Sequence, residues 1–142
     1  MKILLADDDG DDCNFFRDAL EKLPVSTKLN VVNDGEQLMQ LLTNETTEIP
    51  DVLFLDINMP RKDGIECLAE IKSDPSLKDL PVIIFSTSKS KDTMGIVFKA
   101  GAIVYIHKPS DFAQLKQVIH HALQIASENI FSNSPLKYIL NA

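Results

Sequence analysis

The chain has 142 residues, of which 44% are hydrophobic and 25% are charged, and its formal net charge is −7. This length and composition are typical of one globular domain. The acidic balance argues against direct binding to nucleic acid or to an anionic membrane, because both would repel it. No apolar run reaches the length of a membrane span, and no secretory leader follows Met1. We therefore expect a cytoplasmic protein, without membrane insertion, whose partners are proteins.

Short apolar runs alternate with helical repeats of apolar residues, which predicts strands and helices in turn. Strands are expected at 3–6, 29–33, 52–55, 81–85 and 103–106. Helices are expected around 16–23, 38–42, 65–71, 94–98 and 112–126. The run at 52–55 is apolar throughout, which indicates a strand buried on both faces, whereas 29–33 alternates weakly, as an edge strand does. This order needs a parallel sheet with helices on both faces.

Polar residues end four of the predicted strands. Asp7 and Asp8 follow the first strand, Asp56 follows the third, Ser86 follows the fourth and Lys108 follows the fifth. The carboxyl ends of adjacent parallel strands meet at one edge, so we expect these side chains to converge there. Clustered carboxylates repel one another unless a cation neutralises them, which implies a hard divalent cation, and Mg²⁺ binds carboxylate oxygens of this kind. With that ion bound, Asp56 can attack phosphorus while Lys108 and Ser86 contact the phosphoryl oxygens.

The segments around this edge carry turn signals. Asn58 and Pro60 cannot extend a central strand, and Gly64 supplies a flexible turn before the next helix. The Lys108–Pro109 bond is a candidate cis bond, which would turn the lysine inward, although most such bonds are trans. Further acidic residues at 9, 11 and 12 are expected at the start of the first helix, where carboxylates cap amides and oppose the helix dipole.

Taken together, these residues resemble the response-regulator receiver domains of two-component signalling, from Lys2 to about Ala126. The resemblance implies a flavodoxin-like receiver fold, which is a doubly wound, five-stranded parallel sheet with strand order 2-1-3-4-5. It also implies a phosphoryl group accepted on Asp56 from a sensor histidine kinase or a phosphotransfer protein. The stretches DGDD, MPRKDG and SDPSLKDLP look most like the small stand-alone receivers that serve phytochrome-type kinases.

The resemblance also implies a role for each site residue. Mg²⁺ would be held by Asp8 and Asp56 directly, by the backbone carbonyl of Asn58, and by Asp7 through bound water. Ser86 would be the switch hydroxyl, Lys108 the partner of the phosphoryl group and Tyr105 the aromatic switch residue. This sequence departs from the usual pattern in having Ser86 where threonine is commoner and Ser110 where phenylalanine is frequent. Neither change removes required chemistry.

The implied mechanism is a switch and not an enzyme, with at most slow autodephosphorylation. The phosphoryl group would draw Ser86 and Lys108 towards it and favour one arrangement of Tyr105 and of the loop after the fourth strand. The face formed by 94–98, 103–106 and 112–126 would then change its affinity for a downstream protein, which the sequence does not identify.

Two other classes of protein share part of the pattern. Asp7-x-Asp9, Ser86 and Lys108 resemble the motifs of haloacid-dehalogenase-like phosphatases, in which Asp7 would be the nucleophile. That alternative leaves the buried strand before Asp56 unexplained and lacks an acidic pair after Lys108. An EF-hand starting at Asp7 would have Asp12 where glycine is needed.

We expect residues 1–126 to form the receiver domain and residues 127–142 a C-terminal tail without an output domain. The tail holds several large apolar residues that should be covered, and Pro135 favours a short separate segment, Leu136–Leu140, after a turn at Ser132–Ser134. It could fold back on its own domain, dock on a second copy near the last helix to make a homodimer, or await a partner. The homodimer is the arrangement that we favour. Cys13 and Cys67 lack metal-site spacing and are expected as reduced packing thiols.

Overall fold

Strands and helices alternate along the chain, and a short strand follows the last helix. The computed structural model describes residues 1–131 and 138–140. Its elements are β1 (Lys2–Ala6), α1 (Gly10–Glu21), β2 (Lys28–Val32), α2 (Gly35–Thr43), β3 (Val52–Leu55), α3 (Gly64–Ser73), β4 (Val82–Ser86), α4 (Lys91–Ala100), β5 (Val104–His107), α5 (Phe112–Phe131) and β6 (Tyr138–Leu140). The predicted alternation is confirmed, and most strand limits differ from the prediction by one residue.

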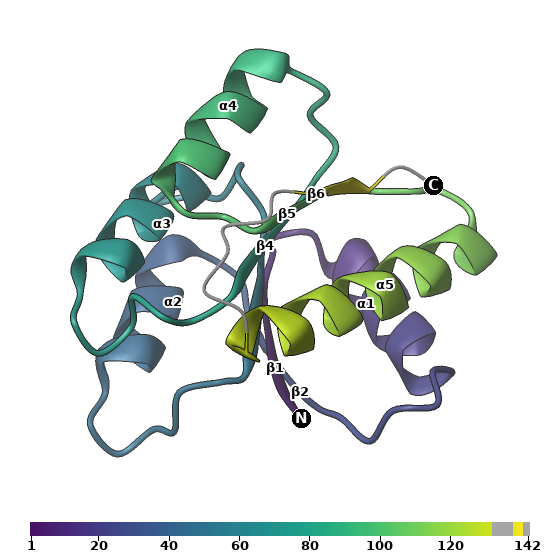
Figure 1. Ribbon diagram of the computed structural model, residues 1–142, viewed down its shortest axis with the longest axis horizontal. Coiled ribbons are helices and arrows are strands. Elements are labelled where there is room, and N and C mark those ends of the chain that lie inside the picture. The colour runs from purple at the N-terminus through teal and green to yellow at the C-terminus, as the bar shows by residue number, and fades with distance from the viewer. Residues whose placement is uncertain (132–137, 141–142) are drawn as a thin grey trace.

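The sheet is parallel throughout and has the order β2-β1-β3-β4-β5-β6. Helices α1 and α5 cover one face, and α2, α3 and α4 cover the other (Figure 1). The doubly wound architecture and the order of the first five strands therefore agree with the expectation, and β2 is an edge strand as predicted. The strand count does not agree, because the sheet has six strands in the described part of the chain where five were expected.

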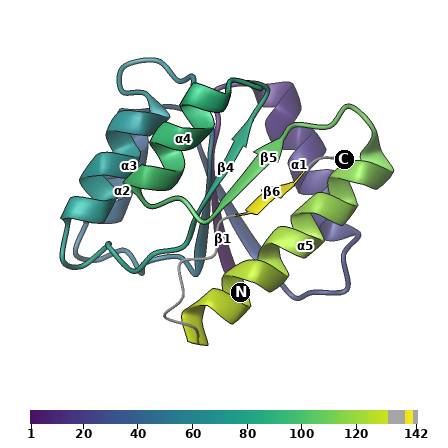
Figure 2. The same ribbon diagram turned by 45° about the horizontal axis from the view of Figure 1, so that its top comes forward.

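Strand β6 shows where the described part of the tail packs. Tyr138 to Leu140 pair in parallel with Val104 to Ile106 of the same chain (Figure 2). Leu140 is buried in the core under α5, so this segment packs on its own domain. β5 is consequently an interior strand, not an edge. The homodimer favoured from the sequence stays a prediction. The predicted turn at Ser132–Ser134 lies outside the described residues.

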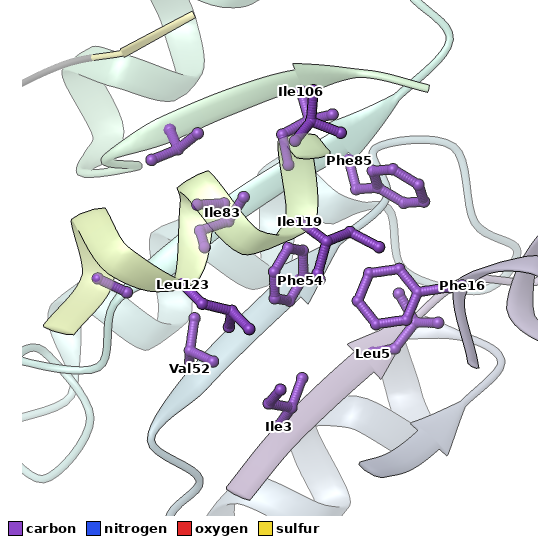
Figure 3. Close-up of a cluster of buried hydrophobic side chains, with 14 of the residues drawn as sticks. Ile3, Leu5, Phe16, Val52, Phe54, Ile83, Phe85, Ile106, Ile119 and Leu123 are labelled. Atoms are coloured by element: carbon purple, nitrogen blue, oxygen red, sulfur yellow. The ribbon is translucent and has the colours of Figure 1, made fainter. Parts of the chain in front are cut away.

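The core has two halves, one on each face of the sheet. Alternate residues of the central strands point to opposite faces: Ile3 and Phe54 pack beneath α1 and α5, whereas Leu4 and Leu53 pack beneath α2 to α4. On the first face the ring of Phe16 from α1 meets the ring of Phe54 edge-on with 4.9 Å between centroids (Figure 3). This burial explains why β1 and β3 read as continuous apolar runs.

Capping residues fix where the helices begin and end. The side chains of Asp9, Asp34, Asp63 and Ser90 each accept a hydrogen bond from the backbone N–H three residues on, at the starts of α1 to α4. α4 ends at Gly101, whose φ of 116° favours glycine. Helices α1 to α4 each follow a strand, so these capped N-termini lie on the side of the sheet where the strands end.

Two smaller expectations, on the cysteines and on one proline bond, are also settled. Cys13 and Cys67 are free and buried on α1 and α3, as packing thiols should be. The described residues contain no cis peptide bond, so Lys108–Pro109 is trans and its cis alternative is wrong. Within the described residues, no helix combines the length and the apolar character needed to cross a bilayer.

Candidate functional site

The polar residues that end the strands of the sheet lie together at its carboxyl edge. Backbone hydrogen bonds continue the strand ladders past the last strand residues, so these positions are held by the sheet. The N–H of Asp56 donates to Ala6 at 2.9 Å, and the N–H of Lys108 donates to Ser86 at 2.9 Å. The side chains that follow β1, β3 and β5 therefore start from fixed backbone points, as the sequence predicts.

Three carboxylates converge at this edge. Asp7, Asp8 and Asp56 each offer an oxygen, and these atoms lie within 4.8 Å of one another. Asp7 and Asp56 are buried while Asp8 is exposed, so the cluster opens to solvent on one side. Oxygen donors in an open cluster suit a hard cation that keeps several waters, which is how Mg²⁺ binds. The residues present therefore fit such an ion.

Lys108 is the cation of this cluster. Its Nζ donates to Asp7 Oδ2 at 2.7 Å, to Asp12 Oδ2 at 2.9 Å and to Asp56 Oδ2 at 3.5 Å. Burial alone would lower the pKa of Lys108, but the hydrogen bonds to Asp7 and Asp12 and the charge of Asp56 outweigh it and raise the pKa above its ordinary value. Lys108 is therefore a permanent positive charge beside Asp56.

The pKa of Asp56 is raised above its ordinary value. Burial raises its pKa to about 6, the charge of Lys108 opposes this rise, and the charge of Asp7 adds to it. A further positive charge at the cluster would favour the carboxylate over the acid. A second cation would therefore increase the share of Asp56 in its nucleophilic, ionised form.

The loop from Asp56 to α3 turns back sharply over the strand end. The N–H of Gly64 donates to Ile57 at 2.8 Å, and a Cβ at Gly64 would lie 2.2 Å from the carbonyl oxygen of Asp56. Only glycine fits this approach. The predicted turn is confirmed, and it keeps Asn58, two residues after Asp56, at the same edge with an exposed side chain.

Ser86 and Tyr105 meet at the loop between β4 and α4. Ser86 is fully buried, and its Oγ accepts a hydrogen bond from the N–H of Ser88 at 3.1 Å. Tyr105 is also fully buried, and its hydroxyl donates to the carbonyl of Ser88 at 2.9 Å. The hydroxyl at the end of β4 and the aromatic ring on β5 thus bind opposite sides of one loop residue.

Asp12 is the site residue that sequence reasoning missed. It was assigned only to the start of the first helix, and its contact with Lys108 was not foreseen. The signal was present in the spacing, because Asp12 is the third residue of α1 and helical side chains lean towards the N-terminus. Here that end of the helix faces the carboxyl edge of the sheet.

The fold and the site together define an α/β protein with a cluster of carboxylates and a buried lysine at the carboxyl edge of its sheet. The model of the response regulator receiver domain family matches residues 3–120, and the chain belongs to this family. Receiver domains are the phosphoacceptors of two-component signalling, which agrees with the expected class of function. The alternative of a haloacid-dehalogenase-like phosphatase gains no support.

Several relatives share most of the chain. It is 31% identical to response regulator Rcp1 of Synechocystis sp. over 121 residues, which are 82% of each protein. It is 35% identical to a solved structure of the phosphorylated cyanobacterial phytochrome response regulator RcpA, with a TM-score of 0.78 over 94% of this chain and 95% of that one. A structure of the Mn²⁺-bound form of Rcp1 has a TM-score of 0.77 and 28% identity, over 94% and 95% of the two chains.

Proposed function

We propose that Asp56 accepts a phosphoryl group and that this modification switches the contacts of the chain with other proteins. The observation that carries the proposal is the convergence of Asp7, Asp8 and Asp56 around one position beside the ammonium of Lys108. A carboxylate can act as a nucleophile towards phosphorus when positive charge neutralises the transferring oxygens. Lys108 supplies one such positive charge, and the cluster of carboxylates is where a metal ion could supply another.

The metal site is proposed to consist of Asp8 and Asp56 as direct ligands, the backbone carbonyl of Asn58, and Asp7 holding bound water. Mg²⁺ would supply positive charge there, lowering the pKa of Asp56 and neutralising phosphoryl oxygens. Asp7 also accepts hydrogen bonds from the N–H of Asp9 and from Lys108, which fix its orientation. Because few protein oxygens are available, binding in the resting state should be weak.

The chemical step needs few groups of the protein. A carboxylate oxygen of Asp56 attacks phosphorus, the bond from phosphorus to the imidazole nitrogen of a phosphohistidine breaks, and that nitrogen keeps the electron pair and takes a proton. Lys108 neutralises one phosphoryl oxygen, and the Ser86 hydroxyl donates to another. We assign the protein no turnover beyond slow loss of the phosphoryl group to water.

The switch is proposed to run through Ser88. Ser86 and Tyr105 both bind this residue, at its N–H and its carbonyl respectively. When the Ser86 hydroxyl turns to the phosphoryl group, its hydrogen bond with the Ser88 N–H is broken. Ser88 can then move, and the hydrogen bond from the Tyr105 hydroxyl to the Ser88 carbonyl changes with it. The α4–β5–α5 face then presents a different surface to a downstream protein, or to a second copy of the chain.

The phosphodonor is proposed to be a phytochrome-type histidine kinase or a phosphotransfer protein, acting in the cytoplasm on residues 1–126. The likeness to RcpA, which is described as a cyanobacterial phytochrome response regulator, supports this choice. Transfer from an autophosphorylated phytochrome kinase should be faster than transfer from an unrelated histidine kinase. Equal rates with both donors would contradict the assignment of the donor, without bearing on Asp56.

The test of the site is mass spectrometry after incubation with phosphoramidate and Mg²⁺. The wild-type chain should gain one phosphoryl group, and Asp56→Asn should gain none while remaining folded. Asp51→Asn, at the opposite end of β3, is the matched control and should label normally. Asp8→Asn should lose both Mg²⁺ binding and labelling. Labelling that survives in Asp56→Asn but disappears in Asp7→Asn would overturn the proposal.

A further inference from the structure

The ammonium of Lys108 has no spare hydrogen bond in the resting protein. An ammonium has three N–H donors, and Lys108 uses them on the three carboxylates of Asp7, Asp12 and Asp56. The contact with Asp56, at 3.5 Å, is the longest of the three, while that with Asp12 is 2.9 Å. Lys108 can therefore donate to a phosphoryl group on Asp56 only if it loses one of these three hydrogen bonds.

Burial decides which partner can be released. The carboxylate of Asp7 is fully buried and also accepts the N–H of Asp9 at 3.0 Å, so losing Lys108 would leave a buried charge without its cation. The Asp12 side chain is 38% exposed, so water can replace Lys108 as its partner. Asp12 also lies in the first turn of α1, where the helix dipole favours a negative charge whatever its partner.

We propose that Asp12 is a positioning residue that holds Lys108 back from Asp56 in the resting protein and releases it when the phosphoryl group arrives. The inference rests on the proposed role of Asp56 as phosphoacceptor. In the resting state Asp12 keeps the ammonium towards α1, which leaves more of the Asp56 carboxylate for a metal ion. On phosphorylation the bond to Asp12 breaks, so its strength opposes the phosphorylated state. Asp12 therefore sets the balance between the two states without touching the reacting atoms.

Removing Asp12 should shift two affinities in opposite directions. Without its partner on α1, Lys108 moves towards Asp56 and competes with the metal, so the affinity for Mg²⁺ alone should fall about twofold or more. The affinity for beryllofluoride, an analogue of the phosphoryl group, should rise about two- to fivefold at saturating Mg²⁺, because the ion pair between Lys108 and the partly exposed Asp12 no longer has to be broken. A purely structural defect at the start of α1 would lower both affinities together.

The experiment is calorimetric titration of the full chain with Mg²⁺ alone and with beryllofluoride at saturating Mg²⁺. Asp12→Ala should show both shifts, and Asp12→Asn should show smaller shifts of the same signs. The matched control is Asp11→Ala, which removes the same charge from the same helical turn at a side chain that makes no hydrogen bond or ion pair within the described residues. It should leave both affinities nearly unchanged.

A double-mutant cycle tests whether the effect passes through Lys108. In a Lys108→Ala background, Asp12→Ala should change the affinity for Mg²⁺ no more than Asp11→Ala does. The inference is overturned if Asp12→Ala and Asp11→Ala behave alike in the wild-type background, or if Asp12→Ala moves both affinities in one direction. Failure of the wild-type chain to bind beryllofluoride would instead overturn the proposed function, and the role of Asp12 with it.

Discussion

Replacing Asp56 by asparagine should stabilise the metal-free protein at neutral pH. Burial raises the pKa of Asp56 from 3.8 to about 6, with Lys108 opposing the rise and Asp7 adding to it. A carboxyl whose pKa is higher in the folded state holds its proton more tightly when folded, so stability falls as pH rises from 3.8 to about 6. At about 1.36 kcal/mol per pKa unit, the folded protein loses about 3 kcal/mol above this window. Asparagine carries no charge and avoids this loss.

The measurement is urea unfolding of both proteins in EDTA at several values between about pH 4 and pH 8. The free energy of unfolding of Asp56→Asn should exceed that of wild type by nearly zero at the acid end and by about 3 kcal/mol at the neutral end. Asp18→Asn, an exposed change on α1, is the control and should show no such trend. A difference that is independent of pH, or a variant less stable than wild type at neutral pH, would refute the reasoning.

Three further substitutions test contacts that stabilise the fold around the site, and each is measured by urea unfolding. Gly64→Ala should cost at least about 2 kcal/mol and slow labelling, because its Cβ would overlap the carbonyl of Asp56 at 2.2 Å; full stability would contradict the close turn. Leu140→Ala should cost about 2 kcal/mol, and no loss would mean that β6 does not pack on this domain. Tyr105→Phe should cost about 1 kcal/mol and speed amide exchange near Ser88, whereas unchanged exchange there would argue against the hydroxyl contact.

The sequence was informative wherever one local rule decided the outcome. The apolar run at Val52–Leu55 has no solvent-facing residue, so it could only be an interior strand, and the residue after it had to lie at the carboxyl edge of the sheet. The same rule placed Ser86 and Lys108. The order of the strands could not be predicted in this way, because no short stretch of sequence specifies on which side of the previous strand the next one is placed. The predicted order came from the family resemblance.

The features that were missed depend on contacts between distant segments. Tyr138–Leu140 is too short to show the alternation of apolar and polar residues that identifies a strand. Whether three such residues join the sheet or a second molecule depends on which edge strand of the sheet is free to pair. Asp12 was placed correctly on its helix, but its bond to Lys108 joins residues 96 positions apart. A capping carboxylate and an ion-pairing carboxylate look alike in sequence, so only the position of α1 over the sheet separates them.

The contact between Lys108 and Asp7 has a practical consequence for anyone who handles this protein. It joins positions 101 residues apart, one just after β1 and the other just after β5, so it forms only when the strands between them are in place. A molecule with any central strand displaced would hold Asp56 without its lysine and with its acidic neighbours scattered. The extent of phosphoryl labelling at saturation should therefore report the fraction of native molecules in a preparation, much as active-site titration does for an enzyme.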